Sequence, residues 1–242
     1  MLKNQVAFVT GGTGAIGSAL VRVLAGHGTR VAFSFHNQED KARALERELG
    51  GERVKAYPLD VLDKAATLKT VEEIERDLGT VDILVNNAGI AQVMPFALIE
   101  EEDWDRMMDV NVKGMFLVSK AFVRGMIRRK KGAVVNVGSL AGMRVLEVPV
   151  HYATAKSAVV GFTLSLAREL SRYNIRVNAV VPGLVEGGVS SNVSDKQRED
   201  YFRHCTVGRA GKPEEVAELV AFLASDRAGY INAQAIHIDG GV

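Results

Sequence analysis

The chain has 242 residues, of which 47% are apolar and 24% charged, and its formal net charge is +1. This composition is typical of a globular protein with a sizeable core, and the small net charge gives no reason to expect nucleic acid or a membrane surface as a partner. No apolar run reaches the length of about eighteen residues that predicts a transmembrane helix, and no signal-peptide pattern occurs. With the lone Cys205 no intrachain disulfide can form. We therefore expect a cytoplasmic protein, and no metal site is predicted.

Short apolar runs rich in β-formers alternate with longer amphipathic stretches along the whole chain. The runs are Val6–Thr10, Arg30–Phe35, Arg53–Tyr57, Val81–Asn86, Gly132–Gly138, Ile175–Val181 and Ala235–Ile238. Most lack in-out alternation, which is typical of strands buried on both faces of a parallel sheet. Strand–helix alternation implies right-handed crossovers. Residues 1–242 are therefore expected to form one α/β domain, a doubly wound parallel sheet of about seven strands with helices on both faces.

Three helix starts can be placed from capping signals. Asn37 is expected to cap a helix that carries Glu39 and Asp40 in its first turn. Asp63 is expected to cap the next helix. Pro213, followed by two acids, is expected near the first position of a later one.

The first strand runs into a glycine-rich turn and then into the helical pattern Ser18–Ala25. A strand, a glycine turn and a helix start in this order present backbone N–H groups and a positive helix end to a pyrophosphate. A flexible turn without a ligand is the alternative. The residues predicted to hold the phosphates are Gly11, Thr13, Gly14, Ala15, Ile16 and Gly17.

Tyr152 and Lys156 are four residues apart in a helical pattern, so their side chains share one face. Ser139 ends the fifth predicted strand. A ketone that gains a hydride needs a proton on its oxygen, and a nearby ammonium brings a tyrosine, with an ordinary pKa of about 10, closer to neutral pH. A serine hydroxyl can stabilise the same oxygen. A surface Tyr–Lys pair is the alternative for the spacing taken alone.

Together with Asn86-Asn87-Ala88-Gly89, these motifs resemble the short-chain dehydrogenase/reductase family over essentially the whole chain. The resemblance implies a Rossmann fold and a nicotinamide-dependent oxidoreductase. It also implies that Tyr152 is the general acid and that Lys156 lowers its pKa and grips the nicotinamide ribose. Ser139 would orient the substrate carbonyl, and Asn111, in the helical stretch Trp104–Arg129, would help to hold a proton-relay water.

The resemblance implies further cofactor contacts beyond the glycine turn. Asp60 and Val61 would hold the adenine, and Asn87, Ala88 and Gly89 would lie beside the cofactor, together with Tyr152, Lys156, Pro182, Gly183 and the backbone of Val185. Two positions depart from the family pattern. Ala15 stands where the middle glycine of the turn is usual, and Gly187 stands where many relatives have a threonine that touches the carboxamide.

The end of the second strand bears on the choice of cofactor. It reads Ser34-Phe35-His36-Asn37, without the acid that usually binds the ribose 2′-hydroxyl of NAD. The absence of an acid favours NADP(H) over NAD(H), with Ser34, His36 and Asn37 as contacts of the 2′-phosphate. The arginine that many NADP-using relatives have in the glycine turn is replaced by Gly14.

Within the family, the likeness is strongest to 3-oxoacyl-(acyl-carrier-protein) reductases and acetoacetyl-CoA reductases. It implies NADPH-dependent reduction of a 3-oxoacyl thioester in fatty-acid or polyketide-type synthesis by a homotetramer. The polar, mixed composition of Ser190–Cys205 suits a mobile substrate lid, and a solvated surface loop is the alternative. Arg128, Arg129 and Arg172 would contact an acidic acyl-carrier protein, although the first two also suit a solvated helix C-terminus. The alternatives are a dehydrogenase of another small secondary alcohol, sugar or steroid, and a non-catalytic nucleotide-sensing regulator.

Overall fold

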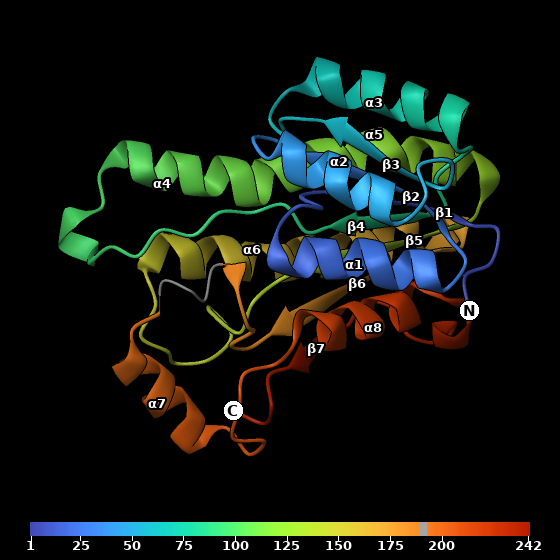
Figure 1. The fold of residues 1–242 in the computed structure, drawn as a ribbon. Helices are drawn as coiled ribbons and strands as arrows, with labels where there is room; N and C mark the ends of the chain where they lie inside the picture. The colour runs from blue at the N-terminus through green and yellow to red at the C-terminus, as the bar shows by residue number, and fades with distance from the viewer. Residues whose placement is uncertain (189–192) are drawn as a thin grey trace.

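The computed structural model describes residues 1–188 and 193–242. A single sheet of seven parallel strands has the order β3-β2-β1-β4-β5-β6-β7, which confirms the doubly wound Rossmann fold (Figure 1). The strands are β1 (Val6–Val9), β2 (Arg30–Phe35), β3 (Val54–Pro58), β4 (Ile83–Asn86), β5 (Gly132–Val137), β6 (Ile175–Pro182) and β7 (Ala235–Ile238).

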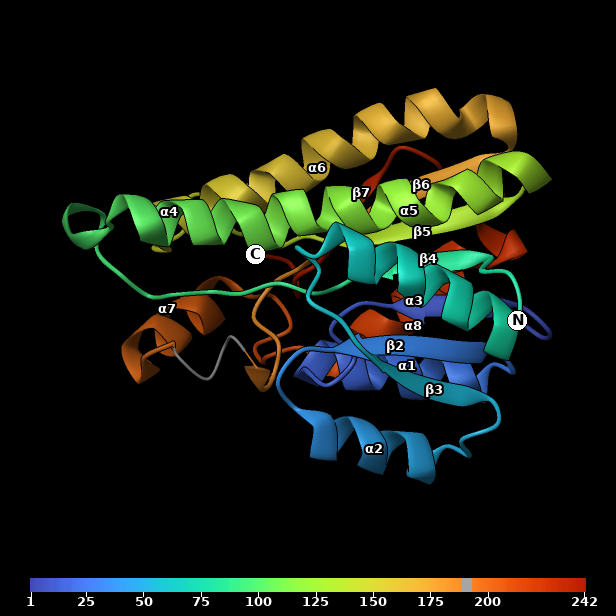
Figure 2. The same ribbon diagram turned by 90° about the horizontal axis from the view of Figure 1, so that it is seen from above.

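Helices cover both faces of this sheet. They are α1 (Ala15–Gly26), α2 (Glu39–Glu48), α3 (Lys64–Asp77), α4 (Glu101–Met108), α5 (Gly114–Arg129), α6 (Val150–Leu170), α7 (Asp195–His204) and α8 (Pro213–Ala224). Short turns are the 3-10 helices η1 (Phe96–Leu98), η3 (Ser171–Tyr173) and η5 (Asp226–Ala228), and the π-helix η2 (Asp109–Lys113). Seen from above, α1, α2 and α8 lie on one face and α3, α5 and α6 on the other (Figure 2).

The core is divided between the two faces by the alternation of side chains along each strand. In β1, Ala7 and Val9 pack toward α1 and α8, whereas Val6 and Phe8 pack toward α3, α5 and α6. The ring of Phe8 stacks on Phe122 of α5 with 4.5 Å between ring centroids. Strands covered in this way need apolar residues at successive positions, which accounts for the continuous apolar runs in the sequence.

Two of the three predicted helix caps are confirmed. The carboxylate of Asp63 accepts a 2.9 Å hydrogen bond from the backbone N–H of Ala66, and Pro213 is the first residue of α8. The prediction for Asn37 is wrong, because α2 starts at Glu39 with Gln38 in the cap position and no side-chain cap bond. The chain bends at His36 and Asn37 after β2, so Asn37 lies one residue too early to reach the free N–H groups of α2.

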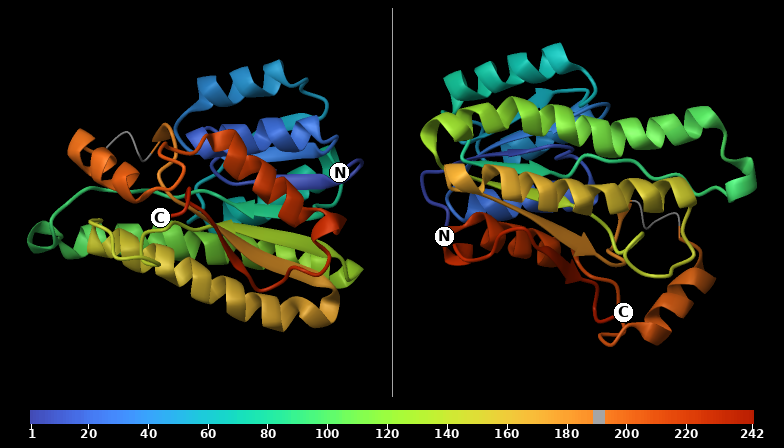
Figure 3. Two further views of the ribbon diagram at one scale, coloured as in Figure 1. Left: turned by 90° about the horizontal axis from the view of Figure 1, so that it is seen from below. Right: turned by 180° about the vertical axis from the view of Figure 1, so that it is seen from behind.

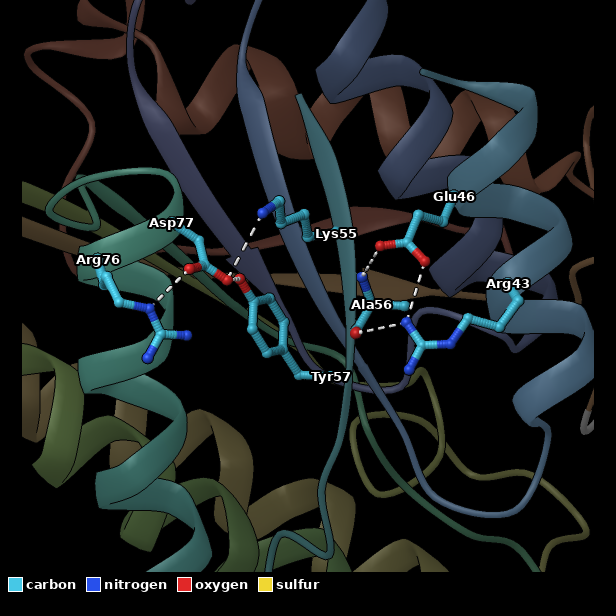
Figure 4. Close-up of polar contacts among 7 residues, drawn as sticks. All are labelled: Arg43, Glu46, Lys55, Ala56, Tyr57, Arg76 and Asp77. Carbon is cyan, nitrogen blue, oxygen red and sulfur yellow. Dashed lines mark hydrogen bonds and ion pairs between the residues drawn. The ribbon is translucent and has the colours of Figure 1, made fainter. Parts of the chain in front are cut away.

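The edge strand β3 is held by polar contacts on both sides (Figure 4). Its outward backbone groups at Ala56 are occupied, since the N–H donates to Glu46 at 3.2 Å and the C=O accepts from Arg43 at 3.1 Å. The hydroxyl of Tyr57 donates to Asp77 of α3 at 3.1 Å. An edge whose backbone groups are already bonded offers little to a foreign strand, so these contacts protect the sheet against edge-to-edge pairing.

The carboxyl ends of the strands all lie at one edge of the sheet, where α4 and α7 extend past the strands (Figures 1 and 3). In folds of this type ligands bind at that edge. Among the described residues, no helix has the length and apolar character needed to cross a membrane.

Candidate active site

The glycine turn is shaped by close backbone contacts at the end of β1. Gly11 has φ +67°, a conformation that L side chains rarely adopt, and a methyl group on Gly17 would overlap the carbonyl oxygen of Gly11. Gly14 caps α1 without a side-chain hydrogen bond, so no side chain occupies the N–H groups at the helix start. The turn is therefore an open cradle of backbone donors with the positive end of a helix behind it.

The second loop of the site, after β4, is fastened directly to this cradle. The backbone N–H groups of Asn87 and Ala88 donate to the hydroxyl of Thr10, at 3.0 and 2.9 Å. The side-chain amide of Asn87 donates to the carbonyl oxygens of Thr10 and Gly11, at 3.0 and 3.1 Å. The side chain of Asn87 thus holds the glycine turn in place, a structural task that the motif alone did not reveal.

A buried chain of polar groups, which the sequence analysis missed, supports the site from below. The amide of Asn86 donates to Ser119 at 2.9 Å and to Asn136 at 2.8 Å, and Asn136 donates to Thr163 at 2.9 Å. These bonds join β4, β5, α5 and α6 beneath the loops. Because buried polar groups are costly when unpaired, these hydrogen bonds fix the positions of the four elements relative to one another.

Ser139, Tyr152 and Lys156 converge at the edge of the sheet. Ser139 follows β5, while Tyr152 and Lys156 come from the first two turns of α6. The Lys156 ammonium donates to the carbonyl oxygen of Val137 at 3.1 Å and lies 5.9 Å from the centre of the Tyr152 ring. All three side chains line one cavity.

Asn111 lies just behind this cavity, inside η2. The predicted helical stretch Trp104–Arg129 is confirmed, with a π turn at Asp109–Lys113 between α4 and α5. The side-chain nitrogen of Asn111 donates to the carbonyl oxygens of Ile90 and Met107, at 3.1 and 3.0 Å, whereas its side-chain oxygen is buried without a hydrogen-bond partner. A small cavity of about 10 Å³ has both Asn111 and Lys156 in its wall.

Burial dominates the electrostatics of the site. It lowers the pKa of Lys156 to about 8. Burial also raises the pKa of Tyr152 above its ordinary value, and a hydrogen bond with Ser139 acts in the opposite direction. In this structure the pKa of Tyr152 is thus shifted upward, against the lowering that the resemblance implied, because desolvation outweighs its polar neighbours.

The cavity has a volume of about 1360 Å³ and runs from the glycine turn to Tyr152. Its size suits a dinucleotide together with a second molecule. Every residue predicted to bind the cofactor lines it. On the glycine turn and β2 these are Gly11, Thr13, Gly14, Ala15, Ile16, Gly17, Ser34, His36 and Asn37. On the other loops they are Asp60, Val61, Asn87, Ala88, Gly89, Tyr152, Lys156, Pro182, Gly183 and Val185.

The three polar residues at the end of β2 differ in how accessible their side chains are to a ligand in the cavity. The hydroxyl of Ser34 is buried and accepts a 3.2 Å hydrogen bond from the backbone N–H of Gly11. His36 and Asn37 are exposed, and the Nε2 atom of His36 lies 3.9 Å from a carboxylate oxygen of Asp60. Of these groups, the side chains of His36 and Asn37 present the more accessible polar atoms to the cavity.

The loop after β6 meets the glycine turn at the two positions that depart from the family pattern. Gly187 has φ +75° and Gly188 has φ +59°, and a β-carbon on either would lie 3.3 Å from the methyl group of Ala15. The methyl of Ala15 therefore takes up space that a side chain at position 187 or 188 would need. Part of the expected lid, residues 190–192, lies outside the described residues, while its second half forms α7.

The three arginines expected to contact a carrier protein lie at the opposite edge of the sheet. Arg128 and Arg129 end α5 just before β5 begins, and Arg172 lies in η3 just before β6. Arg129 donates to the carbonyl oxygen of Val81 at 2.6 Å, which commits its guanidinium to its own chain. Among the described residues, the cavity wall contains none of these three arginines.

Part of the cavity wall was not foreseen from the sequence. It contains Arg106 of α4 and Arg144 and Val145 after β5, whereas Tyr201 of α7 belongs to the expected lid Ser190–Cys205. Val145 is fully exposed. One signal was available in the sequence, namely the apolar stretch Val145–Val150 between the fifth strand and the tyrosine helix, which fits neither a strand nor a helix.

A doubly wound sheet, a phosphate cradle and a convergent Ser–Tyr–Lys set at the same edge define a nicotinamide-dependent oxidoreductase. The comparisons agree with this class. A family model described as "Enoyl-(Acyl carrier protein) reductase" matches residues 12–242. A solved structure of a mutant short-chain dehydrogenase/reductase from Serratia marcescens superposes with a TM-score of 0.92 at 37% identity, covering 99% of this chain and 98% of that one.

Curated relatives match along their whole length. The 3-oxoacyl-(acyl-carrier-protein) reductase FabG of Thermotoga maritima is 38% identical over 243 residues, with 100% of this chain and 98% of the relative covered. Nodulation protein G of Rhizobium meliloti is 39% identical over 241 residues, with the same coverage. The FabG reductase of Escherichia coli is 36% identical over 240 residues, covering 99% and 98%. The chain belongs to the short-chain dehydrogenase/reductase family and is an NAD(P)-dependent oxidoreductase.

Proposed function

We propose that the protein reduces a 3-oxoacyl thioester, carried on acyl-carrier protein or CoA, to the 3-hydroxyacyl thioester with NADPH, in fatty-acid or polyketide-type biosynthesis. The observation that carries this proposal is the convergence of Ser139, Tyr152 and Lys156 in one cavity with the glycine turn. The names of the full-length relatives supply the substrate class. We also propose that residues 1–242 form a single Rossmann-fold oxidoreductase domain.

The cavity fits a nicotinamide dinucleotide. The glycines of the turn let the phosphates approach the backbone N–H groups closely, and no side chain caps the start of α1. When bound, this cofactor supplies the hydride that reduces the carbonyl carbon. Tyr152 gives its proton to the carbonyl oxygen, and Ser139 donates a hydrogen bond to the same oxygen as its negative charge grows. Together the hydride and the proton turn the ketone into a secondary alcohol.

Lys156 and Asn111 have supporting roles in the proposal. The Lys156 ammonium holds the nicotinamide ribose and favours the ionised form of Tyr152 after proton transfer. The unpartnered oxygen of Asn111 and the small cavity that it shares with Lys156 suit a single water molecule, since a volume of roughly 10–15 Å³ is needed to hold one. Such a water would return a proton from solvent toward Tyr152.

The preference for NADPH rests on the end of β2. No acid lies between Ser34 and Gln38, so nothing there repels a 2′-phosphate. The exposed side chains of His36 and Asn37 can contact that phosphate from the cavity rim. A carboxylate oxygen of Asp60 lies 3.9 Å from Nε2 of His36, and we propose that Asp60 faces the adenine.

A homotetramer in the cytoplasm and docking of an acidic carrier protein complete the proposal. Arg128, Arg129 and Arg172 lie at the edge of the sheet opposite the cavity. We propose that the arginines of one protomer contact a carrier protein that is bound at the cavity mouth of a neighbouring protomer. The carrier contact and the oligomer therefore depend on each other.

The test is the initial rate of NADPH oxidation, with NADH in parallel, using acetoacetyl-CoA and acetoacetyl-carrier protein. We expect turnover that prefers NADPH and is faster with the carrier. No turnover with either thioester, despite measurable NADPH binding, would contradict the proposal. It would point instead to a different ketone or secondary alcohol as substrate.

The carrier contact needs its own variants. Reversal of charge at Arg129 also breaks its part-buried bond to Val81, whereas the backbone bond of Arg172 to Glu169 is exposed, so Arg128→Glu and Arg172→Glu are the cleaner changes. We expect them to raise KM for the carrier-bound substrate and to leave KM for acetoacetyl-CoA unchanged, because the small thioester does not use the arginines. Equal KM values for the carrier in wild type and variants, or a protein that is monomeric by sedimentation, would refute the carrier contact.

A further inference from the structure

Tyr201 lies in the middle of α7, and its hydroxyl joins two segments that are distant in sequence. It donates to the backbone carbonyl of Asp239 at 2.7 Å and accepts from the backbone N–H of Leu184 at 3.1 Å. Leu184 follows the Pro182-Gly183 turn at the end of β6, and Asp239 follows β7. A single phenolic oxygen thus connects a helix, a loop and the C-terminal segment.

The surroundings of this oxygen are shaped to receive it. A methyl group on Gly183 would overlap the Tyr201 hydroxyl, so the bare α-carbon of Gly183 provides the necessary room. Burial raises the pKa of Tyr201, which keeps the hydroxyl protonated and able to donate and accept at once. The end of α7 also meets the C-terminal segment, where the backbone N–H of Val207 donates to Gly240 at 3.0 Å.

The segments that Tyr201 joins form two walls of the same cavity. Pro182, Gly183 and Val185 line it after β6, and Gln197, Asp200 and His204 line it from α7. Tyr201 itself also lines the cavity. The hydrogen bonds of the Tyr201 hydroxyl therefore join these two walls directly.

We infer that Tyr201 is a positioning residue that ties the substrate-side helix α7 to the loop beside the nicotinamide pocket. This inference rests on the proposed function only in placing a dinucleotide and a second substrate in the one cavity. Tyr201 acts through Leu184 and Asp239 and not on the reacting atoms. Among the described contacts of its hydroxyl, none involves Ser139, Tyr152 or Lys156, which belong to β5 and α6.

Removing the hydroxyl should loosen the walls and leave the proton donor in place. In Tyr201→Phe we expect the Kd for the dinucleotide and KM for the carbonyl substrate each to rise about tenfold, the size expected when buried backbone groups lose a hydrogen-bond partner. We expect kcat to stay within about twofold, since such an interaction contributes to binding and not to the chemical step. The Kd is measured by nicotinamide fluorescence with whichever dinucleotide binds the wild type.

The chain offers a matched control in Tyr57→Phe. The Tyr57 hydroxyl also donates a hydrogen bond, to Asp77 at 3.1 Å, but it lies on the edge strand β3 outside the cavity wall (Figure 4). The two variants lose the same atom. Tyr57→Phe is expected to lower Tm slightly and to leave Kd, KM and kcat unchanged.

A second variant tests the same tether without deleting the tyrosine. Gly183→Ala crowds both the Tyr201 hydroxyl and the backbone of Asp239, its acceptor, so it should raise Kd as Tyr201→Phe does, and the double variant should show less than the product of the two single effects. Wild-type Kd and KM in Tyr201→Phe, or a loss confined to kcat, would overturn the inference. If wild type fails to reduce acetoacetyl thioesters, the proposed substrate is wrong, while the dinucleotide titration still decides the role of Tyr201.

Discussion

The unpartnered side-chain oxygen of Asn111 and the ammonium of Lys156 face the same bare α-carbon, that of Gly89. A β-carbon on Gly89 would lie 2.5 Å from the Asn111 oxygen and 3.6 Å from Lys156 Nζ. The two polar groups come from η2 and α6, and the bare α-carbon of Gly89 leaves the Asn111 oxygen the space that it occupies.

Gly89→Ala is therefore expected to push the Asn111 amide out of place and to lower kcat roughly 10- to 100-fold, as small misplacements near a reaction centre do. The matched control is Gly161→Ala on α6, where an added β-carbon meets nothing within 4 Å. It should keep wild-type kcat. An equally active Gly89→Ala enzyme would show that the position of Asn111 does not matter to turnover.

Tyr152→Phe is expected to keep the affinity for the dinucleotide and to lose most of the turnover. The ring stays in the cavity wall, whereas the proposed proton donor is gone, and general acid catalysis contributes about 10²–10⁴-fold. Fluorescence titration and initial rates measure the two properties separately. Near-normal rates would refute Tyr152 as the acid.

The pH dependence of reduction should report Lys156. Burial lowers the pKa of Lys156 to about 8 and raises that of Tyr152, so on raising the pH the lysine is the first of the two to lose its proton. We expect kcat/KM to be level below about pH 8 and to fall above it. In Lys156→Arg, whose guanidinium stays charged, the fall should move to higher pH even if the overall rate is lower. A wild-type profile that is level to about pH 10, the ordinary range for lysine, would contradict this assignment.

Stability at acid pH should depend on His151, the residue before Tyr152. Its side chain is completely buried, and neither ring nitrogen has a hydrogen-bond partner. Burial lowers its pKa, and the nearby Asp103 opposes this only in part. Below about pH 6.5 the unfolded chain therefore binds more protons than the folded one, and stability falls as the pH falls. His151→Leu should flatten the dependence of Tm on pH over this range. An unchanged slope would place the acid sensitivity elsewhere.

The two departures from the family pattern, Ala15 and Gly187, are predicted to depend on each other. Gly187→Thr places a β-branched residue at φ +75° and its β-carbon 3.3 Å from the methyl of Ala15, so we expect dinucleotide binding to weaken about tenfold. Adding Ala15→Gly should recover the part that is due to crowding and leave the part that is due to backbone strain. If the second change brings no recovery, the two positions are independent.

Much of the site was predictable because its signals are local. A glycine turn after a strand, and a tyrosine four residues before a lysine, imply their own geometry, so each predicted cofactor residue lies in the cavity. The predicted cap of α2 was one residue too early, at Asn37 and not at Gln38, because capping preferences do not show where the bend after β2 ends. The arginines at 128, 129 and 172 lie just before predicted strands, so their place at the amino edge of the sheet follows from the order of the elements, whereas a contact with a carrier protein does not.

The hydrogen bonds of Tyr201 could not be predicted for a different reason. Its contacts join residues that are 17 and 38 positions apart, through backbone groups that carry no sequence signature. The same holds for the buried chain that links Asn86, Asn136 and Thr163. Such contacts follow from the packing of the whole fold and not from any short segment.

The π turn at Asp109–Lys113 has a consequence for anyone who redesigns this chain. A π turn holds one residue more than an α turn, and one residue corresponds to about 100° of rotation about the helix axis. Deleting any one residue from this turn would convert it into regular α-helix and rotate α4 relative to α5. Asn111 and the face of α4 could then no longer both contact α6. The number of residues between Trp104 and Gly114 is therefore as much a requirement as their identity, and insertions and deletions there deserve more caution than substitutions.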